Sequence, residues 1–473
     1  MSVITDLADF TLRQAESAQR GVGSLFESRL RLGVTGLNRA GKTVFITSLL
    51  ANLRERGRMT LLSAEGDGRI EAAMLRPQPD PEIPRFEFEE HLAALSGSDP
   101  HWPKSTRRIS EVRLSLRYQR TGFFGGLTEN LAGPGILHLD IVDYPGEWLL
   151  DLPLMNQTWA AWSAEALAAA RLPERAAFSG PFLAWAEARA KDAPVDEMVA
   201  KEGARLFADY LKQARSAGLT AVSPGRFLMP GDLDGSPALT FAPIVGGGGL
   251  AGLMADRFEA YKRVVVKPFF RDHFTKIDRQ IVLIDALDAI DAGPRAIGDL
   301  RKALTNILSC FRHGENGWLA PLMGRKIERL LFAATKVDHI HHSQHERLEA
   351  ILRTLLRESV EKAAYNGAKV ETMALASLRA TVEQTVTEDG EKLDCVRGRD
   401  PETGEDTVVF PGTLPEDPAE IVKAAHDREA GWLSEDYQFM KFAPPVLTGR
   451  SGYGPPHLRL DRAADFLIGD RLI

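Results

Sequence analysis

One stretch constrains the fold of this chain more than any other, because it joins a strand-like segment to a glycine-containing loop and a helix-like segment. Residues 30–34 are mostly apolar, as in a buried strand, and residues 44–53 carry apolar side chains at helical spacing. Between them, residues 36–43 read Gly-Leu-Asn-Arg-Ala-Gly-Lys-Thr. Strand, loop and helix in this order predict a phosphate-binding loop of the Walker A type.

The residue types in this loop suit a nucleoside triphosphate. Gly36 and Gly41 allow the backbone to curl so that successive N–H groups point at phosphate oxygens, and the positive end of the next helix adds to this field. Lys42 can reach the β- and γ-phosphates, and the Thr43 hydroxyl can ligate Mg²⁺. We therefore expect the nucleotide to be bound by Gly36, Asn38, Arg39, Ala40, Gly41, Lys42, Thr43 and Val44.

A second element is expected just before the strand predicted at Ile109–Tyr118, where apolar and polar residues alternate. In guanine-nucleotide switches a Thr in this place closes over Mg²⁺ and the γ-phosphate, since its hydroxyl supplies a metal ligand and its N–H a phosphate contact. Thr106 stands there. We expect Thr106 to be a catalytic residue and a metal ligand, with Ser105 or a residue of the preceding loop as the alternative.

A third element follows the buried strand predicted at 136–142 and reads Asp-Tyr-Pro-Gly-Glu-Trp over residues 143–148. In P-loop enzymes an Asp in this place holds Mg²⁺ through a water molecule, and the Gly N–H senses the γ-phosphate. The pattern assigns these roles to Asp143 and Gly146.

Two charged residues depart from Ras-like switches. Glu147 follows Gly146, where a water-orienting Gln is common. Its carboxylate either acts as a general base or holds the attacking water, or it repels the γ-phosphate and slows turnover. Arg39 lies inside the phosphate loop, where it either reaches the phosphates in cis, as an arginine finger does, or points into solvent.

The base is expected to be selected by two loops. After a buried strand predicted at 330–334, the sequence Thr335-Lys336-Val337-Asp338 resembles the Asn/Thr-Lys-x-Asp element of GTPases. The Asp338 carboxylate can accept two hydrogen bonds from guanine and the Lys336 stem can lie across the ring, whereas adenine offers no such pair of donors. A last strand predicted at 373–378 ends in a small-residue loop, where Ser377 and Leu378 would close over the guanine.

Composition excludes several classes of protein. With 473 residues, of which 44% are hydrophobic, the chain is long enough for two or three domains with substantial cores. A formal charge of -7 gives no basic field, so nucleic acid is not an expected partner. Cys310 and Cys395 lie far apart without metal-ligand spacing, which fits reduced thiols in a reducing compartment.

Residues 1–29 are expected to form a helical segment rather than a signal peptide. Acidic residues interrupt it, and no apolar stretch of the chain reaches the ~18 residues of a membrane span. Its apolar residues either touch a membrane or, as we prefer, pack against the body of the protein; they are Val3, Ile4, Leu7 and Phe10. The expected location is the cytoplasm, with peripheral contact at the inner membrane left open.

Between residues 150 and 276 the spacing of apolar residues changes from that of strands to that of helices. Helical spacing dominates there, Trp159, Trp162 and Trp185 are expected in a core, residues 224–243 are expected to be a loop, and the Gly246–Gly249 run predicts a flexible joint. We therefore expect a GTPase domain in two parts, 30–149 and 277–473, interrupted by a helical subdomain at 150–276. That subdomain is the expected contact for a protein partner.

The second part of the expected domain begins with a continuous apolar strand at 280–285 and a helix at 297–311. A β-hairpin is predicted at 394–409 and a closing amphipathic helix at 459–472. His341 and His345 have the spacing of metal ligands, but no third ligand is placed, so a polar helix start explains them better than zinc does.

Taken together, the segments at 36–43, 102–107, 143–148 and 335–338, with Pro-His-Leu-Arg-Leu-Asp-Arg-Ala at 456–463, resemble the YcjX family of bacterial P-loop proteins over nearly the whole chain. The resemblance implies a P-loop NTPase fold of the Ras-like GTPase kind with a helical insertion, binding of GTP and GDP, and a role in envelope stress associated with the phage-shock response. It implies no substrate beyond the nucleotide.

Three hypotheses follow. The leading one is a Mg²⁺-dependent GTP-hydrolysing switch in which nucleotide state moves the Thr106 loop and residues 143–148 and, through Trp148, the helical segment. The second is a nucleotide-dependent scaffold with negligible hydrolysis, motivated by Glu147. The third is an ATPase or small-molecule kinase, which a Walker-type loop alone does not exclude.

Overall fold

The computed structural model describes most of the chain. The predictions for residues 1–26, Asn38 and Thr106 lie outside the described residues, which are 27–37, 39–104, 108–121, 134–189, 193–246, 248–310, 327–365, 367–388, 390–427, 439–447 and 453–473.

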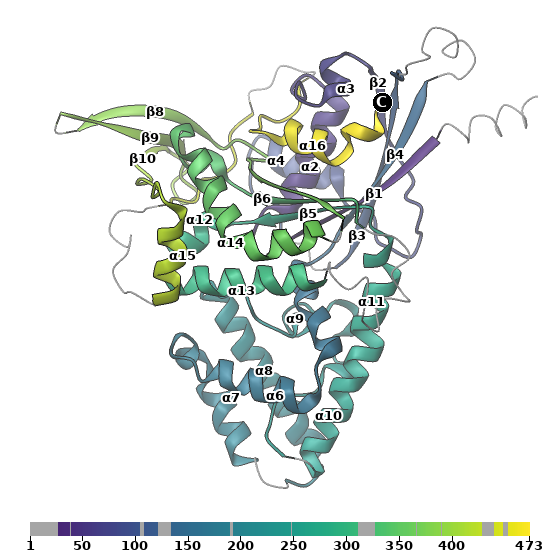
Figure 1. Cartoon of the computed structure of the whole chain (residues 1–473), viewed down its shortest axis with the longest axis vertical. Coiled ribbons are helices and arrows are strands. Elements are labelled where there is room, and N and C mark those ends of the chain that lie inside the picture. The colour runs from purple at the N-terminus through teal and green to yellow at the C-terminus, as the bar shows by residue number, and fades with distance from the viewer. Residues whose placement is uncertain are drawn as a thin grey trace, which may run out of the picture.

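Within these ranges, seven strands form one sheet in the order β2-β3-β4-β1-β5-β6-β7 (Figure 1). The run from β4 through β7 is parallel, while β2 and β3 add an antiparallel edge. The mixed α/β fold with a mostly parallel sheet is therefore confirmed. The strands are β1 (Glu27–Gly36), β2 (Ile70–Arg76), β3 (Ser110–Tyr118), β4 (Gly135–Asp143), β5 (Arg279–Ile284), β6 (Arg329–Ala334) and β7 (Lys369–Ala374).

Helices cover both faces of this sheet, which is why most residues of its inner strands are buried and many of them are apolar. On one face, Leu32 and Val34 of β1 pack in a core with α2 (Lys42–Glu55), α4 (Phe88–Ser96) and α16 (Leu460–Ile468). On the other face, β5 and β6 pack against α13 (Pro294–Cys310) and α14 (His345–Tyr365). The shorter helices here are α3 (Ser63–Gly66), α12 (Ala286–Asp291) and α15 (Pro418–Asp427). Among the described residues, none of the helices has both the length and the apolar character to cross a membrane.

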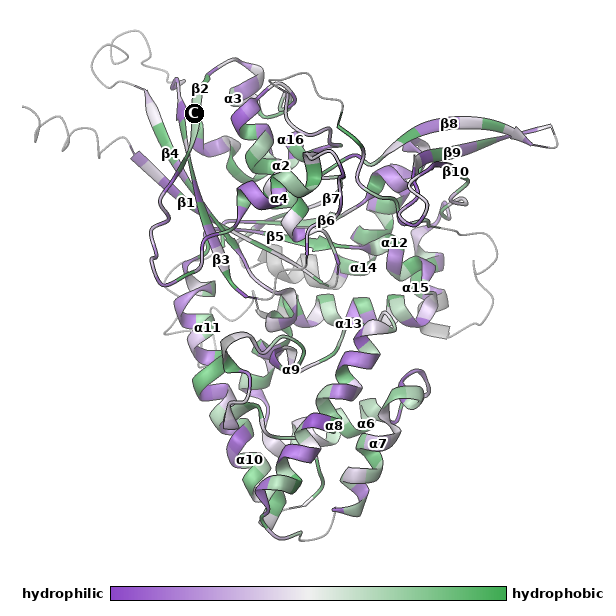
Figure 2. Ribbon diagram, turned by 180° about the vertical axis from the view of Figure 1, so that it is seen from behind, coloured by the Kyte–Doolittle hydropathy of each residue, from purple (hydrophilic) through white to green (hydrophobic). Residues whose placement is uncertain are grey.

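Between β4 and β5 the described chain is built of helices and loops, which lie below the sheet in Figure 1. The longest is α8, whose apolar side chains recur at helical spacing on its buried face and whose N-cap Asp196 accepts hydrogen bonds from two backbone N–H groups. Figure 2 shows hydrophobic and hydrophilic residues on this helix. The elements are η1 (Gly146–Asn156), α6 (Trp159–Ala170), α7 (Ala176–Ala188), α8 (Glu197–Ser216), α9 (Gly225–Leu228), α10 (Gly249–Tyr261), a π-helical turn (Lys262–Val266) and α11 (Lys267–Asp272).

The core of this helical segment is aromatic. Trp162 stacks on Phe258 with ring centroids 4.8 Å apart and meets Phe241 edge-on. Trp162 and Trp185 are buried, as predicted from their helical context, and Trp159 is partly buried beside them. The same core continues to α13 under the sheet, so the helical segment shares one hydrophobic core with that face.

Several local predictions were wrong. The predictions did not include the edge strand β2, whose residues are mostly half-exposed, or α4. The expected loop at 224–243 contains α9 and two 3₁₀ turns, because buried contacts rather than propensity stabilise these short turns. The last strand ends at Ala374, not at residue 378. The hairpin belongs to a three-stranded antiparallel sheet made of β8 (Thr381–Glu388), β9 (Glu391–Arg399) and β10 (Asp406–Val409).

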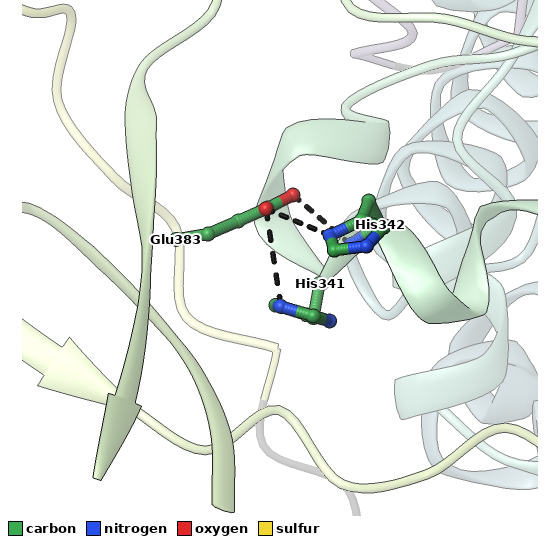
Figure 3. A group of neighbouring side chains, drawn as sticks. All are labelled: His341, His342 and Glu383. Atoms are coloured by element: carbon green, nitrogen blue, oxygen red, sulfur yellow. Dashed lines mark hydrogen bonds and ion pairs between the residues drawn. The ribbon is translucent and has the colours of Figure 1, made fainter.

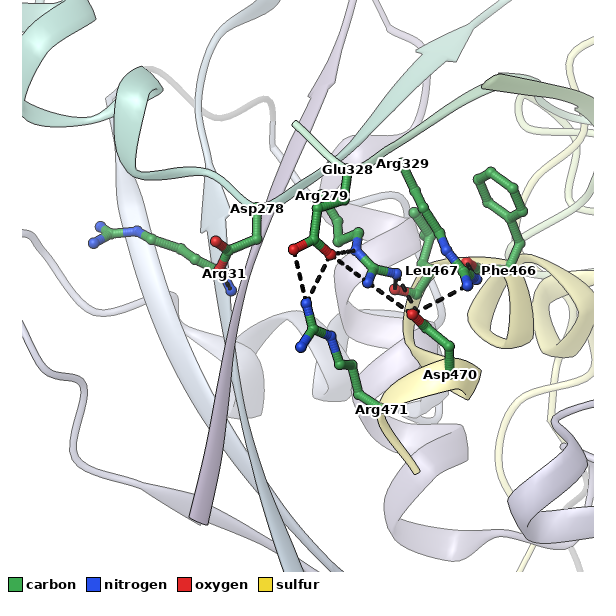
Figure 4. A network of polar contacts seen from close by, with 9 residues as sticks. All are labelled: Arg31, Asp278, Arg279, Glu328, Arg329, Phe466, Leu467, Asp470 and Arg471. Carbon is green, nitrogen blue, oxygen red and sulfur yellow. Dashed lines mark hydrogen bonds and ion pairs between the residues drawn. The ribbon is translucent and has the colours of Figure 1, made fainter. Parts of the chain in front are cut away.

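The amino ends of β5 and β6 are tied to the C-terminus by an ionic network around Arg279 (Figure 4). The guanidinium of Arg279 is almost fully buried and donates to Glu328 at 2.6 Å and to Asp470 at 2.9 Å. Arg471 also binds Glu328, at 2.7 Å. Since these are the amino ends of parallel strands, the network stabilises the edge of the sheet opposite the one where α/β folds bind ligands.

Candidate functional site

A cavity of about 360 Å³ lies where the loops after β1, β6 and β7 converge. In open α/β sheets this carboxyl end is where ligands bind. The two predicted binding motifs therefore meet in one cavity. The lining residues are Arg39, Ala40, Gly41, Lys42, Thr43, Val44, Trp102, Pro103, Arg215, Met229, Thr335, Lys336, Asp338, His339, Ala376, Ser377, Leu378, Lys441 and Phe442.

The described part of the loop after β1 has a left-handed glycine directly before a helix. Gly41 has a φ of 82°, in the left-handed region that favours glycine, and α2 begins at the next residue. The ammonium of Lys42 donates to the carbonyl of Gly36 at 2.9 Å, so the side chain folds back over the loop. Arg39 is exposed and has a φ of 54°. A helix N-terminus with a lysine beside it is suited to binding phosphate.

The segment after β4 is held against this loop. β4 pairs with β1, with Asp143 opposite Val34. A Cβ on Gly146 would lie 2.4 Å from the carbonyl oxygen of Gly36, so no larger residue fits there without a backbone shift. Asp143 and Gly146 are not among the residues that line the cavity. Asp143 lies beside β1, and Gly146 lies against Gly36, where the loop that lines the cavity begins.

The oxygen donors expected for magnesium fit that ion. Thr43 is the second residue of α2 and lines the cavity, and Asp143 ends the strand beside β1; both are buried. A hydroxyl and a carboxylate are the hard ligands that Mg²⁺ takes in proteins.

Glu147 is held by a residue that the sequence did not single out. Its carboxylate accepts from the guanidinium of Arg215, in the last turn of α8, and the two side chains are 4% and 18% exposed. The positive charge of Arg215 offsets the negative charge of Glu147, on which one of the two alternatives for this residue, repulsion of the γ-phosphate, depends. Arg215 was missed because its position comes from helix packing and no motif surrounds it.

The loop at 335–338, which was predicted to select the base, is held in place by its neighbours. The Asp338 side chain is buried and accepts from the backbone N–H of Ala380 at 2.7 Å. Lys336 has a φ of 60°, and its ammonium donates to the Asp285 carboxylate at the end of β5. The backbone N–H of Thr335 donates to Ile284 at 2.9 Å. Lys336 and Asp338 are thus held at the cavity wall by hydrogen bonds to Asp285, which follows β5, and from Ala380, which precedes β8.

The loop after β7 is fixed by the C-terminal segment. Ala376 and Leu458 form an antiparallel bridge with hydrogen bonds of 3.0 and 2.9 Å. Arg459 donates to the carbonyl of Ala374 at 3.0 Å. Ser377 and Leu378, predicted to close over the base, therefore lie in an anchored loop that lines the cavity.

An aromatic wall completes the cavity and was also missed. The indole N–H of Trp102 donates to the carbonyl of Phe442 at 2.8 Å, although the residues are far apart in sequence. Phe442 packs edge-on against His339, with ring centroids 5.3 Å apart. Burial lowers the pKa of His339, so its imidazole is neutral at pH 7. The Trp-Pro pair at 102–103 is the sequence signal that marks part of this wall.

A histidine cluster lies away from this cavity, beside β8. His341, His342 and Glu383 approach one another, and the carboxylate of Glu383 lies 2.8 Å from Nδ1 of His342 (Figure 3). Asp394 lies 3.2 Å from His341. His345 instead places its Nε2 near the carbonyl of Ile340, so the predicted spacing pair does not converge. Close polar contacts with Glu383 and Asp394 account for the arrangement of the cluster.

Comparisons with known proteins agree with this architecture. A family model described as "YcjX-like family, DUF463" matches residues 30–472. A protein of Escherichia coli (strain K12) named "Ras-like GTPase YcjX" is 38% identical over 94% of this chain and 96% of its own length. One of the same name from Shewanella oneidensis is 34% identical over 94% of this chain and 95% of its own length. The chain belongs to the YcjX-like family.

Proposed function

We propose that this protein is a Mg²⁺-dependent switch that binds GTP and GDP and hydrolyses GTP. The observation that carries the proposal is the single cavity lined by both Lys42 and Asp338, which come from loops at distant points of the sequence. One loop suits phosphates and the other suits guanine. The relatives' printed name, Ras-like GTPase, supports the same reading.

At the phosphate end, the N–H groups of residues 39–43 and the ammonium of Lys42 bind the phosphate oxygens. Lys42 then exchanges the Gly36 carbonyl for a phosphate oxygen. Thr43 and Asp143 would hold Mg²⁺, with Asp143 acting through a water molecule, and the ion would supply positive charge that offsets the charge of the phosphates. Asn38 and Thr106 remain part of the proposal, Asn38 as a loop donor and Thr106 as a further metal ligand.

At the base end, Asp338 accepts from the guanine N1–H and amino group, and Lys336 lies beside the ring. Ser377 and Leu378 close over the guanine edge. Trp102 and Phe442 supply the apolar wall on which a flat ring packs favourably.

Residues 143–148 sense the γ-phosphate, and their change of conformation is transmitted to the helical segment. Trp148 packs edge-on against Phe269 of α11, with ring centroids 5.5 Å apart, and the Arg226 guanidinium of α9 lies over the Trp148 ring. A shift of Gly146 therefore displaces the Trp148 side chain, which contacts both α9 and α11. We expect tryptophan fluorescence and proteolysis of residues 150–276 to differ between GDP and a non-hydrolysable GTP analogue; identical behaviour refutes the coupling.

A nucleotide competition titration tests the proposed ligand. We expect GTP and GDP to displace a fluorescent GDP at far lower concentrations than ATP does, and Asp338→Ala to abolish this preference. Asp406→Ala removes an exposed carboxylate of β10 and is the control. Equal competition by ATP and GTP, unaffected by Asp338→Ala, supports an ATPase instead.

The scaffold hypothesis is favoured by one observation, the Glu147 carboxylate in place of a water-orienting Gln. Phosphate release by the purified protein, compared with Lys42→Ala, separates the two functions. A wild-type rate above that of the variant supports hydrolysis, and equal rates support the scaffold.

The cellular part of the proposal rests on the family resemblance. We propose a cytoplasmic protein with a role in envelope stress, in which residues 150–276 act as an inserted subdomain that contacts a protein partner. The partner contact is tested by isolating crosslinked partners from stressed cells. Wild type is compared with a variant in which the exposed side chains of α7 are replaced.

A further inference from the structure

Arg215 is the charged side chain that the helical segment contributes to the cavity lining. It stands in the last turn of α8, far in sequence from the loops that form the rest of the site. Met229 is the other lining residue from this segment, and it has no charge.

Contacts place the Arg215 guanidinium at the phosphate end of the cavity. The ammonium of Lys42 bonds to the Gly36 carbonyl, and Gly146 lies against the same carbonyl. Glu147 is the next residue, and its carboxylate accepts from Arg215. The base-selecting Asp338 belongs to the other end.

Glu147 is positioned for this contact by close backbone packing. A Cβ on Gly225 would lie 2.1 Å from the Glu147 carbonyl oxygen, so α9 approaches the residue as closely as a glycine allows. Glu147 binds Arg215 through Oε1, whereas Oε2 is buried and has no hydrogen-bond partner among the described residues. A guanidinium has five N–H donors in one plane, so an arginine held by one carboxylate retains donors for phosphate oxygens.

We propose that Arg215 is a catalytic residue that the helical segment supplies in cis, and that Glu147 is its positioning residue; this rests on the proposed GTP hydrolysis. Water attacks the γ-phosphorus and its oxygen forms the new P–O bond. The bond from the γ-phosphorus to the β,γ-bridging oxygen breaks, and its electron pair stays on that oxygen. The products are GDP and dihydrogen phosphate, which loses a proton to solvent at neutral pH. Arg215 donates to the oxygens on which negative charge grows during this transfer.

Three variants test the assignment in the full chain. Arg215→Ala removes the guanidinium, and Arg205→Ala removes an exposed arginine of the same helix that pairs with Asp209. Because Arg215→Ala leaves a buried carboxylate unpaired, a second variant combines Arg215→Gln with Glu147→Gln, which removes both charges of this pair and is expected to fold.

We expect Arg215→Ala and the double variant to lower kcat by about 10²–10³-fold while Kd for GDP changes less than about threefold, because the arginine acts on the transition state. Wild type and Arg205→Ala should bind GDP with aluminium fluoride, a mimic of the transferring phosphoryl group, and the two Arg215 variants should not. The aluminium fluoride complex is measured by fluorescence, independently of turnover.

Two results would overturn the role of Arg215 and leave the proposal of GTP binding standing. In the first, kcat of the Arg215 variants stays within threefold of wild type. In the second, kcat and GDP affinity fall in parallel and the aluminium fluoride complex still forms. The second outcome would make the ion pair purely structural. A wild-type rate equal to that of Lys42→Ala would instead overturn the proposed hydrolysis, and the role of Arg215 with it.

Discussion

Asp338→Asn is the most informative change at the base end of the cavity, since it exchanges one acceptor for a donor without altering the shape of the side chain. The backbone N–H of Ala380 donates to one carboxylate oxygen of Asp338 at 2.7 Å. In the variant this N–H requires the amide oxygen, so the amide NH₂ must face the base. The variant therefore presents a donor where guanine also presents donors.

The expected loss follows from the bonds removed. Two hydrogen bonds from guanine to a buried carboxylate contribute about 1.5–3 kcal/mol each. The variant replaces one of them by two donors that face each other and weakens the other by removing the negative charge, so GDP affinity should fall by about 10²–10³-fold. Xanthine carries a carbonyl in place of the guanine amino group and can accept from the new NH₂. We therefore expect xanthosine diphosphate to bind the variant more tightly than GDP does.

Isothermal titration of wild type, Asp338→Asn and the control Asp406→Asn with both nucleotides measures this exchange. The reasoning fails if GDP affinity is unchanged in Asp338→Asn, or if it falls with no gain for the xanthosine nucleotide. The second result would show that Asp338 supports the loop and does not touch the base.

Three further changes are predicted. Gly146→Ala should leave GDP affinity within about threefold but weaken binding of a GTP analogue at least tenfold, because the new methyl group meets the Gly36 carbonyl that stands at the phosphate loop; equal binding of both nucleotides contradicts this. Burial raises the pKa of the Asp151 carboxyl to about 6, although hydrogen bonds to the carboxylate oppose this rise. Between about pH 4 and pH 6 the folded protein therefore keeps a proton on Asp151 that the unfolded chain has released. Wild-type stability relative to Asp151→Asn should therefore fall by about 1 kcal/mol from pH 5 to 7 in urea titrations, and a constant difference would refute it. Asp470→Ala removes one of two carboxylates from the buried Arg279 and should lower unfolding free energy by about 1–2 kcal/mol at pH 7, with unchanged nucleotide binding; a change in GDP affinity would contradict a purely structural network.

The sequence was most informative where chemistry and local structure coincide. The loop at 36–43 needs a left-handed glycine before a helix, and Gly41 has that conformation at that point. The strands β5 and β6 are buried on both faces and contain continuous apolar runs, and β1 and β4 are mostly buried and rich in apolar residues, so all four were predicted from the sequence. The carboxyl ends of such strands meet at one edge, which is why Lys42 and Asp338 could be expected to share a cavity.

The features that sequence reasoning missed depend on tertiary contacts. Nothing around Arg215 in the sequence indicates that helix packing directs it to Glu147. The wall formed by Trp102 and Phe442 depends on a hydrogen bond between segments separated by most of the chain. The edge strand β2 is half-exposed and lacks a strong alternation, so no pattern marks it.

The central claim is that one cavity holds the phosphates and the base of a single guanine nucleotide. A crystal structure of the protein with Mg²⁺ and GDP tests it most directly. We predict that phosphate oxygens lie within hydrogen-bond distance of the Lys42 ammonium while the guanine N1–H lies within hydrogen-bond distance of Asp338. A nucleotide that contacts Lys42 but places its base away from Asp338 would contradict the account.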